Sequence, residues 1–277
     1  MNKPFVDLHI HSLYSDGTMT PQEIADAAEA NGVGIIAVAD HNVLEGNILT
    51  RELCKGKGIQ CIPAVELFAV DEGRMLHVLA YGFDEKDISF NEYLNYSRLV
   101  MEETGVALID IMAREYSNVS VDEYLKFSYE RHLGGWKTLH YLLGKGFTTA
   151  LKQGYSFGPK YGVTNDNSGF ASIAAVVCRT KMAGGVSVLA HPGQSLATND
   201  IDEFKRALKK LVAYGLDGIE CYYPTHSGAV VQACLDVCNE YGLMVTAGSD
   251  CHGGFGNSRV GEMNITVDKL KLGNLYS

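Results

Sequence analysis

The sequence has 277 residues, with a hydrophobic fraction of 46% and a charged fraction of 20%. These values are typical of a folded globular domain and exclude a disordered chain. A net charge of −10 argues against duplex nucleic acid or an anionic membrane as a surface partner. An anionic substrate stays compatible with this charge, because bound metal ions reverse the sign locally.

Targeting and redox signals are sparse in the sequence. No apolar run approaches the roughly 20 residues that span a bilayer, and residues 1–10 lack the charged and apolar regions of an export signal. The seven cysteines do not have the spacing of a secreted disulfide scaffold. We therefore expect reduced, mostly buried cysteines and a cytoplasmic protein.

Short apolar runs alternate with amphipathic stretches in both the first and the last third of the chain, which is typical of a parallel α/β protein. The first predicted helix begins at Thr20, with Pro21 and Glu23 completing a capping box. Later helices over about 200–214 and 228–241 stop at glycines. The predicted strands are Val6–Ile10, Ile35–Ala39, Gln60–Val65, Met75–Tyr81, Val186–Ala190, Gly218–Tyr222 and Met244–Ala247.

The middle of the chain has a different pattern. Residues 85–184 carry almost no strand signal. Helical patterns recur there at about 90–114, 121–128, 136–145 and 170–182. We expect a helical insertion, or cap, over 85–184 within an α/β domain formed by residues 1–84 and 185–277.

Ionisable side chains concentrate at the ends of the predicted strands. His9 and His11 lie two residues apart in the first strand, so they point to the same side of it. In a parallel barrel all strand ends open onto one face, where residues distant in sequence converge. Buried imidazoles and carboxylates are costly unless they pair or bind metal, and together they suit zinc, manganese or iron. The other such residues are Asp16 in the loop after the first strand, His77 within the fourth strand, and, at strand ends, Asp40, His41, Glu66, His191, Glu220, Asp250 and His252.

These residues lie in eight short motifs, which are Asp7–Ser12, Ser15–Thr18, Thr20–Glu23, Ala39–Asn42, Pro63–Glu66, Leu189–Pro192, Gly218–Glu220 and Gly248–His252. The motifs resemble those of the PHP (polymerase and histidinol phosphatase) domain family. The layout is most similar to its small-phosphoesterase branch, which acts on nucleotides such as AMP or 3′,5′-bisphosphates and carries a helical insertion. The resemblance implies a distorted (β/α)7 barrel with a trinuclear metal site.

Carried over motif by motif, the resemblance implies two or three divalent ions, of zinc, manganese or iron. The implied ligand sets, with Glu66 bridging the first two, are His9, His11, Glu66 and Asp250; Glu66, His77 and His191; and Asp16, His41 and His252. Asp40 and Glu220 are expected to orient histidine rings, although local backbone contacts would explain both equally well.

The insertion departs from the family pattern, in which a helix rich in arginine and histidine reaches the substrate phosphate. The basic residues available here for that contact are Arg131, His132, Lys137 and His140. An ordinary solvated helix face would account for them too. His226 either contacts a phosphate or caps the following helix. Trp136, the sole tryptophan, either stacks on a base or anchors the core of the insertion.

The implied activity is that of a phosphoric monoester hydrolase, acting on a small nucleotide of the AMP or 3′,5′-bisphosphate type through metal-bound hydroxide. Asp250 and Glu66 are the implied catalytic residues, with Asp250 accepting a proton from the water. Histidinol phosphatase is the nearest alternative. A polymerase-associated module and a non-catalytic module that binds metal or nucleotide are alternatives from other classes. The sequence gives no prediction of the oligomeric state.

Overall fold

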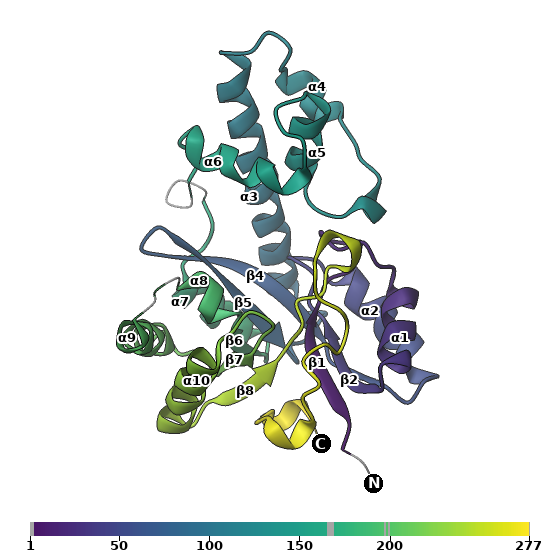
Figure 1. Cartoon of the computed structure of the whole chain (residues 1–277), viewed down its shortest axis with the longest axis vertical. Helices are drawn as coiled ribbons and strands as arrows, with labels where there is room; N and C mark the ends of the chain where they lie inside the picture. The colour runs from purple at the N-terminus through teal and green to yellow at the C-terminus, as the bar shows by residue number, and fades with distance from the viewer. Residues whose placement is uncertain (1–2, 165–168, 197, 199, 277) are drawn as a thin grey trace.

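The computed structural model describes residues 3–164, 169–196, 198 and 200–276. Two sheets form the lower part of the molecule, and helices lie on their outer faces (Figure 1). The first sheet is parallel and has the order β1 (Phe5–Ile10), β2 (Val33–Val38), β3 (Gln60–Cys61). The second sheet has the order β4 (Ala64–Asp71), β5 (Arg74–Tyr81), β6 (Val186–Leu189), β7 (Gly218–Tyr222), β8 (Met244–Ala247).

The α/β class predicted from the sequence is confirmed, but the described strands form two sheets and do not form one closed barrel. Isolated parallel bridges join the sheets on both sides, between Ile10 and Cys251 and between His41 and Glu66. Ile10 is the last residue of β1, and His41 follows β2 by three residues. The sheets therefore come together where these strands end.

The direction of β5 differs from the parallel arrangement that the sequence suggested, because β5 is antiparallel to both β4 and β6. A tight hairpin causes the reversal. Asp71 pairs with Arg74 across a two-residue turn in which Glu72 and Gly73 have φ of 47° and 73°. The reversal brings the beginning of β5, with His77, to the edge where the neighbouring strands end.

Helices bury the outer face of each sheet. α1 (Pro21–Ala30) and α2 (Glu45–Lys55) pack on the first sheet, and the predicted capping box of Thr20 and Glu23 is present. The second sheet is covered by α7 (Ile173–Met182), α9 (Ile201–Val212) and α10 (Gly228–Tyr241). The one-turn helix α8 (Pro192–Ser195) follows β6 directly. A third apolar cluster, which includes Leu8, Ile35 and Tyr81, fills the space between the sheets.

The helices of the middle segment rise above the sheets (Figure 1). The long helix α3 (Ile88–Ala113) begins in the core of the second sheet, where Phe90 and Leu94 are buried. It ends in a separate apolar cluster that includes Ile109 and Tyr141. The other elements of this upper part are α4 (Val121–Lys126), η1 (Arg131–Leu133), α5 (Lys137–Gly144), η2 (Leu151–Ser156) and α6 (Phe157–Lys160).

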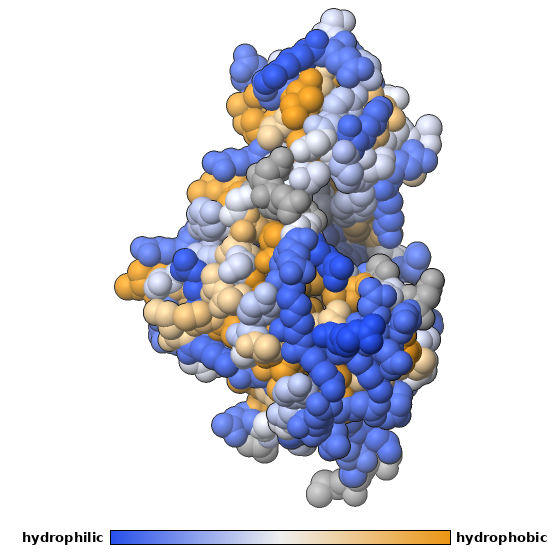
Figure 2. Space-filling view, turned by 90° about the vertical axis from the view of Figure 1, so that its left-hand side faces the viewer, coloured by the Kyte–Doolittle hydropathy of each residue, from blue (hydrophilic) through white to orange (hydrophobic). Residues whose placement is uncertain are grey.

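The surface mixes hydrophilic and apolar residues. On the face shown in Figure 2, hydrophilic residues dominate the lower part, while apolar residues form separate patches. None of the described helices combines the length and the apolar character that crossing a bilayer requires.

Candidate metal centre

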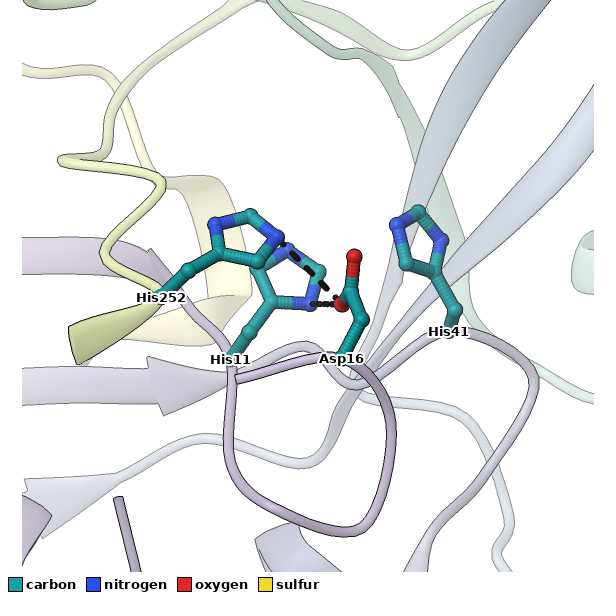
Figure 3. A group of neighbouring side chains, drawn as sticks. All are labelled: His11, Asp16, His41 and His252. Atoms are coloured by element: carbon teal, nitrogen blue, oxygen red, sulfur yellow. Dashed lines mark ion pairs between the residues drawn. The ribbon is translucent and has the colours of Figure 1, made fainter. Parts of the chain in front are cut away.

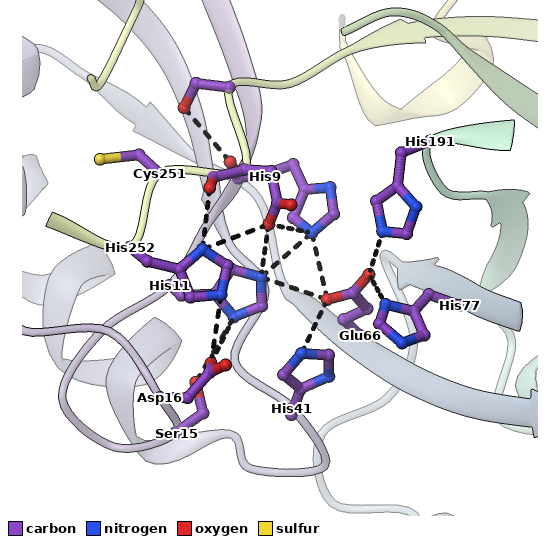
Figure 4. A network of polar contacts seen from close by, with 12 residues as sticks. His9, His11, Ser15, Asp16, His41, Glu66, His77, His191, Cys251 and His252 are labelled. Carbon is purple, nitrogen blue, oxygen red and sulfur yellow. Dashed lines mark hydrogen bonds and ion pairs between the residues drawn. The ribbon is translucent and has the colours of Figure 1, made fainter. Parts of the chain in front are cut away.

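The nine side chains expected to bind metal form one polar cluster at the strand ends (Figure 4). His9 comes from β1 and His11 follows it directly, while Glu66 comes from β4 and His77 from β5. His41, His191, Asp250 and His252 follow β2, β6 and β8, and Asp16 lies in the loop after β1. The cluster therefore draws on both sheets.

Glu66 lies at the centre of the cluster (Figure 4). Its Oε1 is 2.9 Å from Nδ1 of His77 and 3.2 Å from Nε2 of His191. Its Oε2 lies 3.1–3.3 Å from the Nε2 atoms of His9, His11 and His41. One carboxylate thus faces five imidazoles, with its two oxygens turned to different subsets of them.

The geometry divides the cluster into three groups whose ligand atoms lie within 4.8 Å of one another, and these groups are His9, His11, Glu66 and Asp250; His41, Glu66 and His77; and His11, Asp16, His41 and His252. The first group coincides with an expected ligand set. The second group contains His41 in the place where His191 was expected. The third group contains His11 in addition to its three expected ligands. His191 belongs to none of the three, although its ring meets Glu66.

Asp16 connects the histidines of the third group (Figure 3). Its Oδ1 is 3.3 Å from Nε2 of His252 and 3.6 Å from Nδ1 of His11. His11 and His252 stack with ring centroids 4.1 Å apart. Asp16 Oδ1 and His41 Nδ1 are buried, yet neither forms a hydrogen bond with a described residue.

This donor set fits divalent cations. Buried polar atoms are normally satisfied, so His41 Nδ1 calls for a partner that the described residues do not supply. Nε2 atoms of His9 and His11 approach to 3.1 Å, and both also face Oδ1 of Asp250, at 3.3 and 3.1 Å. Two ring nitrogens and a carboxylate converging on one point is the arrangement of a metal site with nitrogen and oxygen ligands.

The electrostatics of the protein alone agree with this interpretation. Burial opposes ionisation of Glu66, but the charges of His9, His77 and His41 outweigh it and hold its pKa well below its usual range. Burial likewise opposes a charge on His11, yet Asp250 and Glu66 raise its pKa to about 10. Burial lowers the pKa of His41 to about 3. The carboxylate of Glu66 is therefore ionised and available to bind a cation.

Glu220 acts on two members of the cluster, as expected from the sequence. Its Oε1 is 3.1 Å from Nδ1 of His9, on the far side of the ring from the cluster, and its Oε2 accepts a 2.8 Å hydrogen bond from the backbone N–H of His191. Glu220 therefore fixes the His9 ring and the backbone at His191 together.

Asp40 does not bond any histidine ring directly, so its expected role in orienting one stays a prediction beside the alternative of local backbone contacts. Its carboxylate accepts hydrogen bonds from the backbone N–H and hydroxyl of Ser12 and from the hydroxyl of Ser15, at 2.6–2.8 Å. The Ser15 hydroxyl lies 3.4 Å from Nδ1 of His11. Asp40 therefore shapes the loop that carries Asp16 and reaches His11 through Ser15.

Two supporting residues were missed by sequence reasoning. Asp7 is buried and accepts hydrogen bonds from the N–H groups of Ser249 and Gly261, at 2.9 and 2.7 Å. Tyr223 donates a 2.9 Å hydrogen bond to Oδ2 of Asp250. Asp7 continues the period-two spacing of the strand histidines, and Tyr223 immediately follows β7. Both signals were present in the sequence.

Two hollows meet at the cluster. The first, which we call the aromatic chamber, has a volume of about 280 Å³ and is bounded by Phe68, Trp136 and Tyr155 besides the cluster itself. The second, the polar chamber, has a volume of about 630 Å³ and includes Lys152 and Asn257. The two chambers share Asp16, Tyr155, Gln194, Asp250 and His252.

The five residues expected to contact the substrate line neither of these chambers. The exposed His132 lies near Glu130, and Lys137 donates a hydrogen bond to the backbone carbonyl of Leu125. Nε2 of His140 is bonded to the carbonyl of Gly134 and its ring stacks on Tyr129.

The two remaining candidates make backbone contacts. Arg131 reaches the carbonyl of Ser15, at 3.5 Å. His226 accepts a hydrogen bond from the N–H of Gly193 and donates one to the carbonyl of Cys221, both 3.0 Å long. None of the five lines either chamber, so their role in substrate binding stays a prediction.

Comparisons with known proteins agree with the motifs. The model of the PHP domain family matches residues 7–221. The chain is 29% identical to a phosphoribosyl 1,2-cyclic phosphate 1,2-diphosphodiesterase of Eggerthella lenta, covering 90% of this chain and 95% of the relative. It is 28% identical to a 3′,5′-nucleoside bisphosphate phosphatase of Chromobacterium violaceum, covering 89% and 87%.

Further similarity extends over whole chains. A 5′-3′ exoribonuclease of Haemophilus influenzae is 27% identical, covering 95% of this chain and 96% of the relative. A solved structure from Bifidobacterium adolescentis, described as a proposed metal-dependent phosphoesterase, superposes with a TM-score of 0.75 over 96% of this chain and 93% of its own. Its sequence identity is 24%, so this likeness concerns the fold alone.

Proposed function

This chain belongs to the PHP domain family, and we propose that it is a metal-dependent phosphoesterase that hydrolyses a small phosphate ester. The observation that carries the proposal is the cluster around Glu66, in which one buried carboxylate faces five imidazoles. A cluster of this kind is costly in a folded protein unless metal ions occupy it.

In this proposal the residues that hold divalent zinc, manganese or iron are His9, His11, Asp16, His41, Glu66, His77, His191, Asp250 and His252. When bound, such ions lower the pKa of water and neutralise charge on phosphate oxygens. Two or three ions fit the groups that share Glu66, His11 and His41. Glu66 would contribute to two of these groups, because its two oxygens face different histidines.

The protein's own residues orient these ligands and handle the proton. Glu220 fixes the His9 ring, and Tyr223 holds Oδ2 of Asp250. Oδ1 of Asp250 is then the oxygen that faces the cluster, 3.3 and 3.1 Å from Nε2 of His9 and His11, and we assign it as the acceptor of the proton released from water. Within the expected insertion, the segment from η1 to η2 serves as a cap, because Trp136 and Tyr155 bound the aromatic chamber and the N–H of Gly135 bonds the carbonyl of Asp16 at 2.8 Å.

We propose a nucleotide phosphomonoester as the substrate. Trp136 and Tyr155 offer aromatic surfaces beside the cluster, which suits a planar base. The relative from Chromobacterium violaceum is named as a bisphosphate phosphatase, which supports this choice. The relatives from Eggerthella lenta and Haemophilus influenzae are named as a diesterase and an exoribonuclease, so a phosphodiester is the second candidate.

The test combines elemental analysis with phosphate release from AMP, adenosine 3′,5′-bisphosphate and histidinol phosphate, and with cleavage of bis(p-nitrophenyl) phosphate, with and without manganese. We expect two or three metals per chain and metal-dependent release from a nucleotide. Phosphate release from histidinol phosphate alone would contradict the nucleotide substrate and favour histidinol phosphatase. Cleavage of the diester alone would contradict the monoesterase activity and favour a phosphodiesterase.

The matched variants are Glu66→Gln and Glu92→Gln, the latter an exposed carboxylate on α3. Glu66→Gln should lower activity by more than about 100-fold, because even the outer partners of metal ligands are worth 10- to 100-fold. Glu92→Gln should retain activity and metal. A Glu66→Gln protein with full metal content and activity would refute the proposed centre.

A further inference from the structure

We infer that the middle segment of the chain controls one of the metal positions through residues 134–135, which we call the glycine turn. The turn holds the loop that carries Asp16, and Tyr129 and His140 are positioning residues because they hold the turn. The inference rests on the proposed phosphoesterase function and adds to it a dependence of the third ligand group on the middle segment. This group is His11, Asp16, His41 and His252.

The glycine turn contacts the backbone of a residue that is expected to supply a ligand. The N–H of Gly135 donates a 2.8 Å hydrogen bond to the carbonyl of Asp16. A Cβ added at Gly134 would lie 2.9 Å from the same carbonyl oxygen and 2.9 Å from Cγ2 of Thr18. Oδ1 of Asp16 lies 3.3 Å from Nε2 of His252, so a shift of this backbone would change the geometry of the ligand group.

The same turn also packs on the loop that carries His252. A Cβ added at Gly134 would lie 2.6 Å from Cβ of Phe255, which follows His252 by three residues. The two loops are joined to each other, since the N–H of Thr18 donates to the carbonyl of His252 at 3.1 Å. The N–H of Gly254 donates in turn to the Thr18 hydroxyl at 2.8 Å. The glycine turn therefore packs on a joined pair of loops that supplies two members of the third group.

Only glycine fits both positions of the turn. Gly134 and Gly135 have φ of 68° and 70°, which residues with a Cβ rarely adopt. A Cβ at Gly135 would also lie 2.9 Å from the ring of Phe255. The same lack of Cβ atoms lets the peptide group between the two glycines rotate more freely than others in the chain. The direction of this peptide group therefore depends on its hydrogen bonds.

His140 fixes this peptide group at its oxygen. Nε2 of His140 donates a 2.8 Å hydrogen bond to the carbonyl of Gly134, whose carbon is joined to the nitrogen of Gly135. A trans peptide group is planar, so its C=O and N–H point in opposite directions. A donor on the oxygen therefore directs the N–H of Gly135 toward Asp16, and hydrogen bonds in such a chain polarise one another.

Tyr129 holds both the next carbonyl and the His140 ring. Its hydroxyl donates a 2.7 Å hydrogen bond to the carbonyl of Gly135. Its ring stacks on the buried ring of His140, with centroids 4.2 Å apart and an angle of 15° between the planes. Both side chains belong to the middle segment, yet their polar atoms bond the turn that meets the two metal-binding loops.

The experiment measures the affinity of each manganese ion for the metal-free protein by isothermal titration calorimetry. The variants His140→Phe and Tyr129→Phe each keep an aromatic ring and lose one donor to the turn. Tyr161→Phe is the matched control, because Tyr161 is a half-buried tyrosine of the middle segment whose hydroxyl bonds that of Tyr116. His140→Phe and Tyr129→Phe should each weaken one manganese ion by about 10-fold, the lower end of the effect of an outer partner of a ligand. The other ions should bind as before, and Tyr161→Phe should change no affinity.

A second set of variants shows whether the effect passes through Asp16. In an Asp16→Asn background, His140→Phe should cause no further loss of metal affinity, because both changes then act on the same ion. An undiminished loss in that background would overturn the inference. Equal weakening of every ion, together with a lower unfolding midpoint, would also overturn it, since His140 would then support only the fold of the middle segment.

Metal affinity separates this inference from the proposed function. A protein in which His140→Phe weakens one ion, but which hydrolyses no ester, would contradict the phosphoesterase proposal and keep the role of the glycine turn. A metal-dependent hydrolase in which His140→Phe and Tyr129→Phe bind every ion as tightly as the unchanged protein would do the opposite.

Discussion

At the scale of single residues, the two oxygens of Asp250 have different partners. Oδ1 faces His9 and His11, whereas Oδ2 accepts the hydrogen bond of the Tyr223 hydroxyl. A carboxylate that is held at one oxygen presents the other in a fixed direction, which is how outer partners tune metal ligands. Tyr223 therefore determines where Oδ1 of Asp250 points.

Tyr223→Phe should weaken metal binding by about 10-fold, the lower end of the effect of losing an outer partner of a ligand. Competition with a fluorescent chelator would measure it. Tyr214→Phe is the matched control, because Tyr214 also donates to an aspartate, Asp71, away from the cluster. Equal metal affinity in both variants would show that Tyr223 does not position Asp250.

The sequence could identify the cluster because its members carry a simple signal. His9 and His11 follow the period of a strand, and His41, His191, Asp250 and His252 occur just after strands stop, whereas Glu66 and His77 lie within β4 and β5. It could not assign Asp40, because only folding brings its carboxylate onto the hydroxyls of Ser12 and Ser15.

At the scale of elements, the strand ends place the ligands by adopting unusual backbone conformations. His191 and Asp250 have φ of 28° and 51°, and Asn42 beside His41 has φ of 56°. Such conformations cost about 1–3 kcal/mol each and persist where the surroundings over-determine them. Here Glu220 bonds the N–H of His191, which is one such constraint.

Gly248, immediately after β8, shows how tight these strand ends are. A Cβ at this position would lie 2.2 Å from Cβ of His9 and 2.4 Å from Oε1 of Glu220. Gly248→Ala should therefore displace the His9 ring and destabilise the protein by roughly 1–3 kcal/mol, the usual cost of overpacking. The metal content would report the displaced ring, and the midpoint of unfolding in urea would report the loss of stability.

Gly144→Ala is the control, since its Cβ would meet nothing within 4 Å. It should leave metal content unchanged. A Gly248→Ala protein with normal metal content and midpoint would mean that the strand end shifts without cost.

The strand positions themselves were largely predictable, because each apolar run is bounded by polar or turn residues. Predicted strands over 218–222 and 244–247 agree with β7 and β8. The run over 60–65 is instead divided at Ile62 and Pro63, since proline has no N–H to donate to a ladder. The reversal of β5 depends on the two-residue turn at Glu72 and Gly73, and a hydropathy pattern does not reveal such a turn.

At the scale of the whole molecule, the cluster unites two sheets that share few hydrogen bonds. Ile10 with Cys251 and His41 with Glu66 are isolated bridges between them. Metal ions held jointly by Glu66 from the second sheet and His11 from the first would add bonds between the sheets. Binding free energy of this kind is also folding free energy.

Removal of the metal with a chelator should therefore lower the unfolding temperature. Ligand at 100 times its Kd contributes about 2.7 kcal/mol, and a domain of this size shifts by about 2–4 °C per kcal/mol, so we expect a loss of roughly 5–10 °C. Calorimetry with and without added manganese would measure it. The unfolding temperature of Glu66→Gln should fall little when the chelator is added. A large fall in this variant would mean that the stabilising metal binds elsewhere.

The order of the ligands along the chain has a consequence for biosynthesis. The group of His9, His11, Glu66 and Asp250 joins the first strand to the segment after the last one. During translation the two strand histidines leave the ribosome early, but their carboxylate partner emerges only after β8. A nascent chain cannot complete this group until β8 and Asp250 have been made, so capture of a metal by these four residues would have to follow the synthesis of β8.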